Sequence, residues 1–164
     1  MQTSCIIFVT NHRIMYNAIL HAHSGLRWVA LILLLLAIFN AAKSMQSGNY
    51  TDKDKKINLF AMIFIHVQVL IGLVLYFMSP KVQFIEGWMS SDVANGMFRF
   101  FGVEHIVGMI LAAVVLTIGR RKAEKKLKGT RDKHRAILIY YVLALLIIIL
   151  FIPWPFRGFG NGWF

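Results

Sequence analysis

Three histidines lie in or beside long apolar stretches, where ionisable side chains are rare. His66 lies within the almost wholly apolar segment 57–77, His105 lies within another at 100–119, and His23 comes just before a third. An imidazole buried in hydrocarbon is costly unless it bonds to another group. Neutral imidazole is a common ligand of haem iron, and it is also a hydrogen-bonding group between membrane helices. These positions therefore indicate either a cofactor site or contacts that hold helices together.

The composition is that of a polytopic membrane protein. The chain has 164 residues, of which 58% are hydrophobic, and its mean hydropathy is +0.63. Its net charge is +11, but the Lys and Arg residues fall mostly between apolar runs, so lipid head groups explain them better than nucleic acid does. Cys5 is the only cysteine, which excludes an internal disulfide and a thiolate metal cluster. The sequence contains no Ser-His-Asp set, phosphate loop or nucleotide fingerprint.

Four segments are long and apolar enough to cross a bilayer, which requires roughly 20 residues. Because the connections are short, they predict an all-α integral membrane bundle of four helices with up-down-up-down topology. Residues 1–14 are expected to be an extension outside the fold, and residues 15–164 a single transmembrane domain. The four spans are predicted at about residues 24–42, 57–78, 100–119 and 136–154.

The charge of the connecting loops predicts the orientation. Segments 43–56 and 120–135 are rich in Lys and Arg, whereas segment 79–99 holds only Lys81 and Arg99 against Glu86 and Asp92. Basic loops of membrane proteins remain in the cytoplasm. Both termini are therefore expected on the periplasmic side of a bacterial inner membrane.

The depth of each histidine follows from the 1.5 Å rise per helical residue. Counted from the basic loops, His66 lies roughly 15 Å deep, His105 roughly 22 Å and His23 roughly 30 Å, at the opposite boundary. His66 and His105 are therefore the preferred pair of haem-iron ligands. His23 is the substitute for His66, since a ligand pair from the first and third helices across a bundle is ordinary geometry.

The helix faces favour the same interpretation. His23, Arg27 and Ala30 share one side of the first span, which places the Arg27 guanidinium near a haem propionate. The second span presents an apolar wall, and the third presents small residues that would leave room for a flat porphyrin. The wall consists of Met62, His66, Val69, Leu70 and Leu73, and the small face of Gly102, His105, Gly108, Met109 and Ala112.

Simpler interpretations remain for each residue. The small face is equally typical of a helix–helix contact, and a single buried histidine is more often an interhelical hydrogen-bond donor than a ligand. Arg27 has two alternatives, an ion pair with Glu104 or extension of its side chain to the membrane interface. His134, within "RDKHRA", is expected to be a solvated loop residue.

Several segments resemble one family. They are "HAHSGLRW", "HVQVLIGLVLYF", "FRFFGVEHIVGMILAAVVLTIGR" and "IPWPF". They are similar to small four-span membrane proteins of Bacteroidota-type bacteria that are labelled cytochrome b or cytochrome b-like, and the similarity extends from Met15 onward. The resemblance implies an inner-membrane haem b protein in electron transfer. Large respiratory cytochromes b carry paired histidines on two helices, and this chain lacks such pairs. This argues against electron transfer across the membrane through two haems.

We therefore expect one b-type haem and single-electron transfer, with quinone or a larger respiratory complex as partner. This predicts an electron carrier or subunit rather than a stand-alone enzyme, in a homo- or hetero-oligomer. One alternative is a non-redox subunit that anchors a membrane complex. Another is copper handling, for which the candidate ligands are His23, His66, His105, Met62 and Met109.

Overall fold

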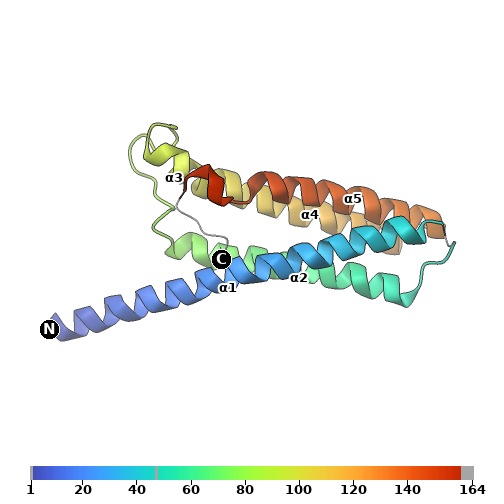
Figure 1. The fold of residues 1–164 in the computed structure, drawn as a ribbon, viewed down its shortest axis with the longest axis horizontal. Helices are drawn as coiled ribbons and strands as arrows, with labels where there is room; N and C mark the ends of the chain where they lie inside the picture. Colours follow the sequence, from blue (N-terminus) through green and yellow to red (C-terminus); the bar gives the residue numbers. More distant parts are fainter. Residues whose placement is uncertain (1, 47, 160–164) are drawn as a thin grey trace.

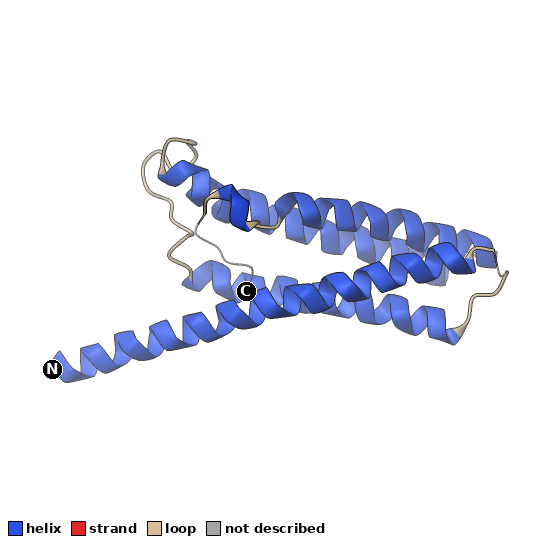
Figure 2. Cartoon of the chain, in the orientation of Figure 1, coloured by secondary structure: helices blue, strands red, loops and turns tan. Residues whose placement is uncertain are grey.

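The protein is a bundle of four long helices, as the sequence predicts. A computed structural model describes residues 2–46 and 48–159, with side chains from residue 13 onward. The described residues form no strand (Figure 2). The long helices are α1 (Gln2–Ser44), α2 (Asp52–Met78), α4 (His105–Lys125) and α5 (Thr130–Phe151). Short elements precede α4 and follow α5: η1 (Ala94–Gly96), α3 (Met97–Arg99), the π-helical turn η2 (Phe100–Glu104) and η3 (Pro155–Arg157).

Each helix packs against two others, so the bundle has a cyclic order. The adjacent pairs are α1 with α2, α2 with α4, α4 with α5, and α5 with α1. Helices α1 and α4 therefore lie diagonally across the bundle. Small residues fill the shared core, including Ala37, Ala61, Ala112 and Ala144, none of which is exposed. Close packing of this kind through small side chains is typical of membrane helices.

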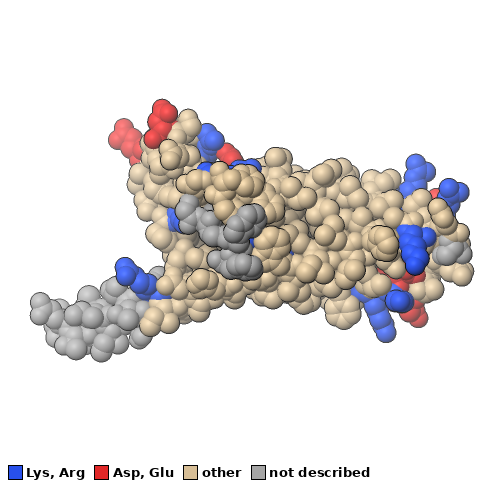
Figure 3. Space-filling view, in the orientation of Figure 1, with Lys and Arg blue, Asp and Glu red and all other residues tan. Residues whose placement is uncertain are grey.

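The outside of the bundle is apolar over most of its length. Four helical segments meet the length and hydropathy required to cross a membrane, Arg13–Ser44, Asp52–Met78, Ala94–Lys125 and Thr130–Phe151. Large apolar side chains such as Phe39, Leu70 and Leu146 are more than half exposed on these helices. On the face in Figure 3, charged side chains gather toward the two ends of the bundle. This architecture is that of a multi-pass membrane protein whose helices contact lipid.

Helix α1 is longer than predicted. Its backbone is helical from Gln2, so the segment 2–14 continues α1. That residues 1–14 add nothing to the fold stays a prediction. Figure 1 shows this part of α1 extending past the rest of the bundle. Forty-three residues correspond to about 65 Å of helix, roughly twice the thickness of the hydrocarbon core.

The two ends of the bundle differ in their connecting segments, and they are called the basic end and the cavity end. The basic end carries the short connections 45–51 and 126–129. The cavity end carries the long loop 79–93 and the segment 152–159. The pair α1 and α2 separates from the pair α4 and α5 toward the cavity end (Figure 1).

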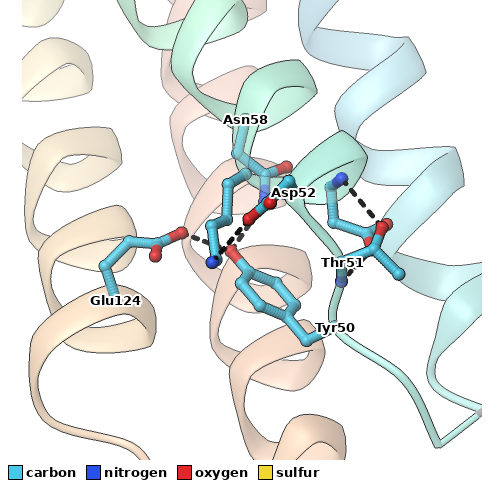
Figure 4. Close-up of polar contacts among 7 residues, drawn as sticks. Tyr50, Thr51, Asp52, Asn58 and Glu124 are labelled. Atoms are coloured by element: carbon cyan, nitrogen blue, oxygen red, sulfur yellow. Dashed lines mark hydrogen bonds and ion pairs between the residues drawn. The ribbon is translucent and has the colours of Figure 1, made fainter.

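At the basic end a polar cluster joins loop and helices (Figure 4). Thr51 caps α2, and its hydroxyl and backbone N–H donate to Asp54 over 2.6 and 2.7 Å. The Tyr50 hydroxyl donates to Glu124 of α4 over 2.6 Å and accepts from Asn58 of α2 over 3.2 Å. Burial and the carboxylate of Glu124 raise the pKa of Tyr50, so this hydroxyl stays protonated.

His134 belongs to this cluster, and its prediction as a solvated loop residue is wrong. Its side chain is fully buried in the first turns of α5. Its Nε2 donates to the carbonyl of Asn49 over 2.8 Å, and its ring meets Tyr50 edge-on, with ring centroids 4.9 Å apart. No local sequence pattern indicates this contact, because the partner is the backbone of a loop 85 residues earlier.

Candidate functional site

A cavity of about 330 Å³ opens inside the cavity end, between all four long helices. This volume lies at the lower end of the range of small-molecule sites, about 300–1,000 Å³. Its surface is largely apolar, and ten polar side chains from α1, α2, α4 and the loop after α2 also line it. Those polar side chains are Tyr16, His21, His23, Ser24, Arg27, Gln68, Tyr76, Ser79, Lys81 and His105.

The predicted face of α1 is confirmed. His23, Arg27 and Ala30 all line the cavity, as their spacing requires. Gly72 of α2 makes room for the His23 ring, because a Cβ at this position would lie 3.2 Å from His23 Cε1. Gln68, also on α2, donates from Nε2 to the His23 carbonyl over 3.1 Å and so ties the two helices together here.

His105 also lines the cavity, and a backbone carbonyl at the end of α5 holds its ring. Helix α5 ends at Phe151, because Ile152 precedes Pro153 and is extended, so the Phe151 carbonyl has no partner within the helix. His105 Nδ1 lies 2.7 Å from that oxygen. Because a carbonyl only accepts, Nδ1 carries the proton and Nε2 keeps its lone pair. A backbone carbonyl that fixes the imidazole in this way is the usual support of a metal-ligating histidine.

His23 complements His105 from the diagonal helix. Its Nδ1 is buried and has no hydrogen-bond partner among the described residues. His23, His105 and Arg27 line the same cavity. The Gln68 Oε1 atom of α2 is likewise buried and without a hydrogen-bond partner in the part of the chain that the structure describes. Buried polar atoms of this kind are rare, and beside a cavity they indicate a place for a bound group.

His66 is placed differently. It does not line the cavity. Its Nδ1 lies 2.8 Å from the Met62 carbonyl of its own helix, and its Nε2 lies 3.2 Å from Thr117 Oγ1 of α4. The structure therefore brings His23, not His66, into one cavity with His105, and it gives His66 the role of an interhelical hydrogen-bonding group.

The small face of α4 does not leave room for a ring, and that prediction is wrong. A Cβ at Gly108 would collide with the Phe151 ring of α5, so this glycine is a helix-packing position. Gly102 faces Trp88 and Phe84 of the loop, and Ala112 is fully buried in the core. The π-helical turn at 100–104 contributes to the error, since it shifts Gly102 out of register with the residues after His105.

Sequence reasoning also missed Lys81. It lies in the loop beyond α2, where no helical spacing indicates direction, yet it lines the cavity. Its Nζ donates to the Phe159 carbonyl over 2.9 Å. Arg27 lines the same cavity, and its guanidinium lies 5.1 Å from the Trp28 ring. The alternative partner considered for Arg27, Glu104, instead pairs with Arg99 over 2.7 Å.

Within the part of the chain that the structure describes, no three His, Cys, Asp or Glu side chains group to hold a metal ion. The five candidate copper ligands are divided: His23, His105 and Met109 line the cavity, whereas His66 and Met62 do not. A haem requires less of the protein, since two imidazoles fill both axial positions of its iron. The orphaned His23 Nδ1, the supported His105 ring, the apolar wall and two nearby cations are compatible with such a group.

In comparisons with protein-family models, curated proteins and solved structures, nothing matches this chain.

Proposed function

We propose that the protein is a membrane-embedded b-type haem protein that transfers single electrons, with His23 and His105 as the iron ligands. The observation that carries the proposal is the convergence of two histidines from diagonal helices on one apolar cavity. When bound between two imidazoles, haem iron has no open axial position, which favours electron transfer over oxygen chemistry. The resemblance to small cytochrome b-like proteins agrees with this proposal.

The chain's own residues prepare the cavity for such a group. The Phe151 carbonyl holds the His105 proton on Nδ1, so Nε2 is available as a ligand. Gly72 has no side chain and so leaves space for the His23 ring. The hydrogen bond from Gln68 Nε2 to the His23 carbonyl fixes this part of α1 against α2. Apolar side chains from α2 and α5, among them Val69 and Ile148, exclude water from the wall.

We further propose that the chain lies in a bacterial inner membrane with both termini on the periplasmic side. Lys and Arg residues dominate the basic end, and the rule for cytoplasmic loops supports this orientation. The cavity would then open nearer the periplasmic face, where quinone or a larger respiratory complex would exchange electrons with the group inside. A C-terminal alkaline phosphatase fusion should be active, whereas activity of a cytoplasmic reporter at the same place contradicts the orientation.

The visible spectrum tests the haem proposal. Protein expressed with ample haem and purified in detergent should show the bands of reduced haem b after dithionite. His105→Ala and His23→Ala should each abolish the six-coordinate low-spin spectrum, whereas His66→Ala should retain it. Loss of the bands in His66→Ala with retention in His23→Ala would restore the pair preferred from sequence. Colourless wild-type protein without iron would exclude the proposal and leave the anchoring subunit as the better interpretation.

A further inference from the structure

Two buried polar atoms at the cavity belong to residues that already contact each other. Gln68 of α2 donates from Nε2 to the His23 carbonyl over 3.1 Å, yet its Oε1 has no hydrogen-bond partner among the described residues. His23 Nδ1 is buried without a partner in the same part of the chain. Buried polar groups are nearly always hydrogen-bonded, so this pair of unsatisfied atoms indicates a contact beyond the one that the two residues make.

The orientation of the Gln68 amide is fixed by its first bond. The His23 carbonyl can only accept, so the end of the amide that faces it is the nitrogen, and the other end is the oxygen. The two ends of a planar amide lie about 2.3 Å apart, which keeps Oε1 beside the same turn of α1. The Gln68 side chain is buried and lines the cavity. Its Oε1 is therefore an acceptor held at the cavity next to His23.

The His23 ring has the complementary requirement. A neutral imidazole carries its proton on one nitrogen and a lone pair on the other, and a ligand nitrogen must present the lone pair. Ligation through Nε2 therefore leaves the proton on Nδ1, where a metal-ligating histidine usually has an acceptor. His105 has such an acceptor in the Phe151 carbonyl. Gly72, which faces Cε1 of the His23 ring, leaves space on the α2 side of this ring.

We propose that Gln68 is the positioning residue of His23: its Oε1 accepts the Nδ1 proton, after a rotation of the ring, when Nε2 is an iron ligand. This inference rests on the proposed function. Both ends of one amide then serve the same ligand, since Nε2 holds the backbone of α1 and Oε1 holds the ring. His105 and His23 share one tautomer but have different supports, a backbone carbonyl and a side-chain amide. Only the side-chain support changes on substitution, so the residue at position 68 tunes the iron.

The reduction potential of the haem-loaded protein separates this role from a purely structural one. Gln68→Met loses both the donor and the acceptor, whereas Gln68→Glu loses the amide donor and keeps an acceptor. An acceptor on Nδ1 makes the imidazole more basic and favours ferric iron. Gln68→Met should lower the affinity for ferric relative to ferrous haem about tenfold, which raises the potential by about 59 mV. Gln68→Glu should leave the potential at or below the wild-type value.

Gln83 provides matched controls. It is exposed in the loop after α2 and does not line the cavity. Gln83→Met and Gln83→Glu make the same chemical changes away from His23 and should leave the potential unchanged.

A second measurement needs no substitution. Ferrous protein labelled with ¹⁵N-histidine shows the Nδ1–H groups of the two ligands by NMR, shifted by the ring current of the porphyrin. In the wild type both groups should exchange slowly with D2O, because each donates to a buried acceptor. In Gln68→Met the His105 group should stay protected and the His23 group should exchange quickly.

Three results would overturn the role of Gln68 and leave the haem proposal in place. They are protection of only one ligand group in a low-spin wild type, protection of both groups in Gln68→Met, and an equal rise of the potential in both Gln68 variants. A wild type that binds no haem overturns both proposals.

Discussion

The two ends of the bundle use buried polar side chains for opposite purposes. At the basic end, Tyr50, Asn58, His134 and Glu124 bond to one another or to loop backbone, and so hold helices and loops together. At the cavity end, His23 and its neighbours surround an internal space. The role of a buried histidine in a membrane bundle therefore follows from its partners and not from its depth.

The loops explain part of the difference. Connections 45–51 and 126–129 are short, and backbone atoms within them or beside them accept bonds from α5, including Thr130 Oγ1 to the Gly48 carbonyl over 2.7 Å. At the other end a long loop joins α2 to α3, and the helix pairs separate (Figure 1).

The largest effect on stability is expected at the basic end. His134→Leu removes the hydrogen bond from this fully buried side chain to the Asn49 carbonyl and the edge contact with Tyr50. The free energy of unfolding in detergent should fall by about 2 kcal/mol, shared between the lost hydrogen bond and the lost ring contact. His134→Gln, which can still donate, should lose less. If the two variants unfold alike, the hydrogen bond is not what holds this end together.

A smaller effect is expected midway between the ends. Thr117→Val removes the hydroxyl that lies 3.2 Å from His66 Nε2 while keeping the side-chain shape. Hydrogen bonds between membrane helices contribute about 0.6 kcal/mol on average, and a loss of this size should appear in unfolding titrations. Thr117→Ser is the matched control and should retain stability. Altered haem bands in Thr117→Val would indicate that His66 is nearer the iron than the structure places it.

The same change of histidine to leucine should cost almost nothing at the cavity end. The His23 and His134 rings each carry a buried Nδ1 without a partner among the described residues, but only His134 makes a ring hydrogen bond, through Nε2. Removal of the His23 ring therefore relieves a desolvation penalty and breaks no hydrogen bond to a described residue. In haem-free protein, His23→Leu should change the unfolding free energy by less than about 0.5 kcal/mol. A loss as large as that of His134→Leu would abolish the distinction between the two ends.

The smallest effect is expected beyond the cavity end. A chain that begins at Met15 keeps Tyr16 and Leu20, the first α1 residues on the cavity wall. It should insert, purify and unfold as the full chain does, measured by membrane yield and thermal unfolding. Loss of folded protein would show that the first turns of α1 support the bundle.

The spacing of apolar residues and the distribution of charge predicted most of the fold. Apolar length gave four helices, loop charge located the basic end, and spacing placed His23 and Arg27 on one face of α1. Spacing failed at Gly108, because a small residue leaves space only until a ring from another helix fills it. It failed at His134 and Lys81, because their partners are loop backbone atoms and nothing local in sequence indicates them.

The π-helical turn before His105 makes the number of residues in this part of the chain important. In η2 the His105 N–H bonds to the Phe100 carbonyl, five residues back, so this turn holds one residue more than an α-helical turn does. Deleting one residue between Phe100 and His105 would make this an ordinary α-helical bond, four residues back, between the same two groups. Phe100 and His105 would then keep their relative places, and only the side chains between them would move around the helix axis. The extra residue therefore decides which side chains lie beside His105 and leaves the helix on either side in phase.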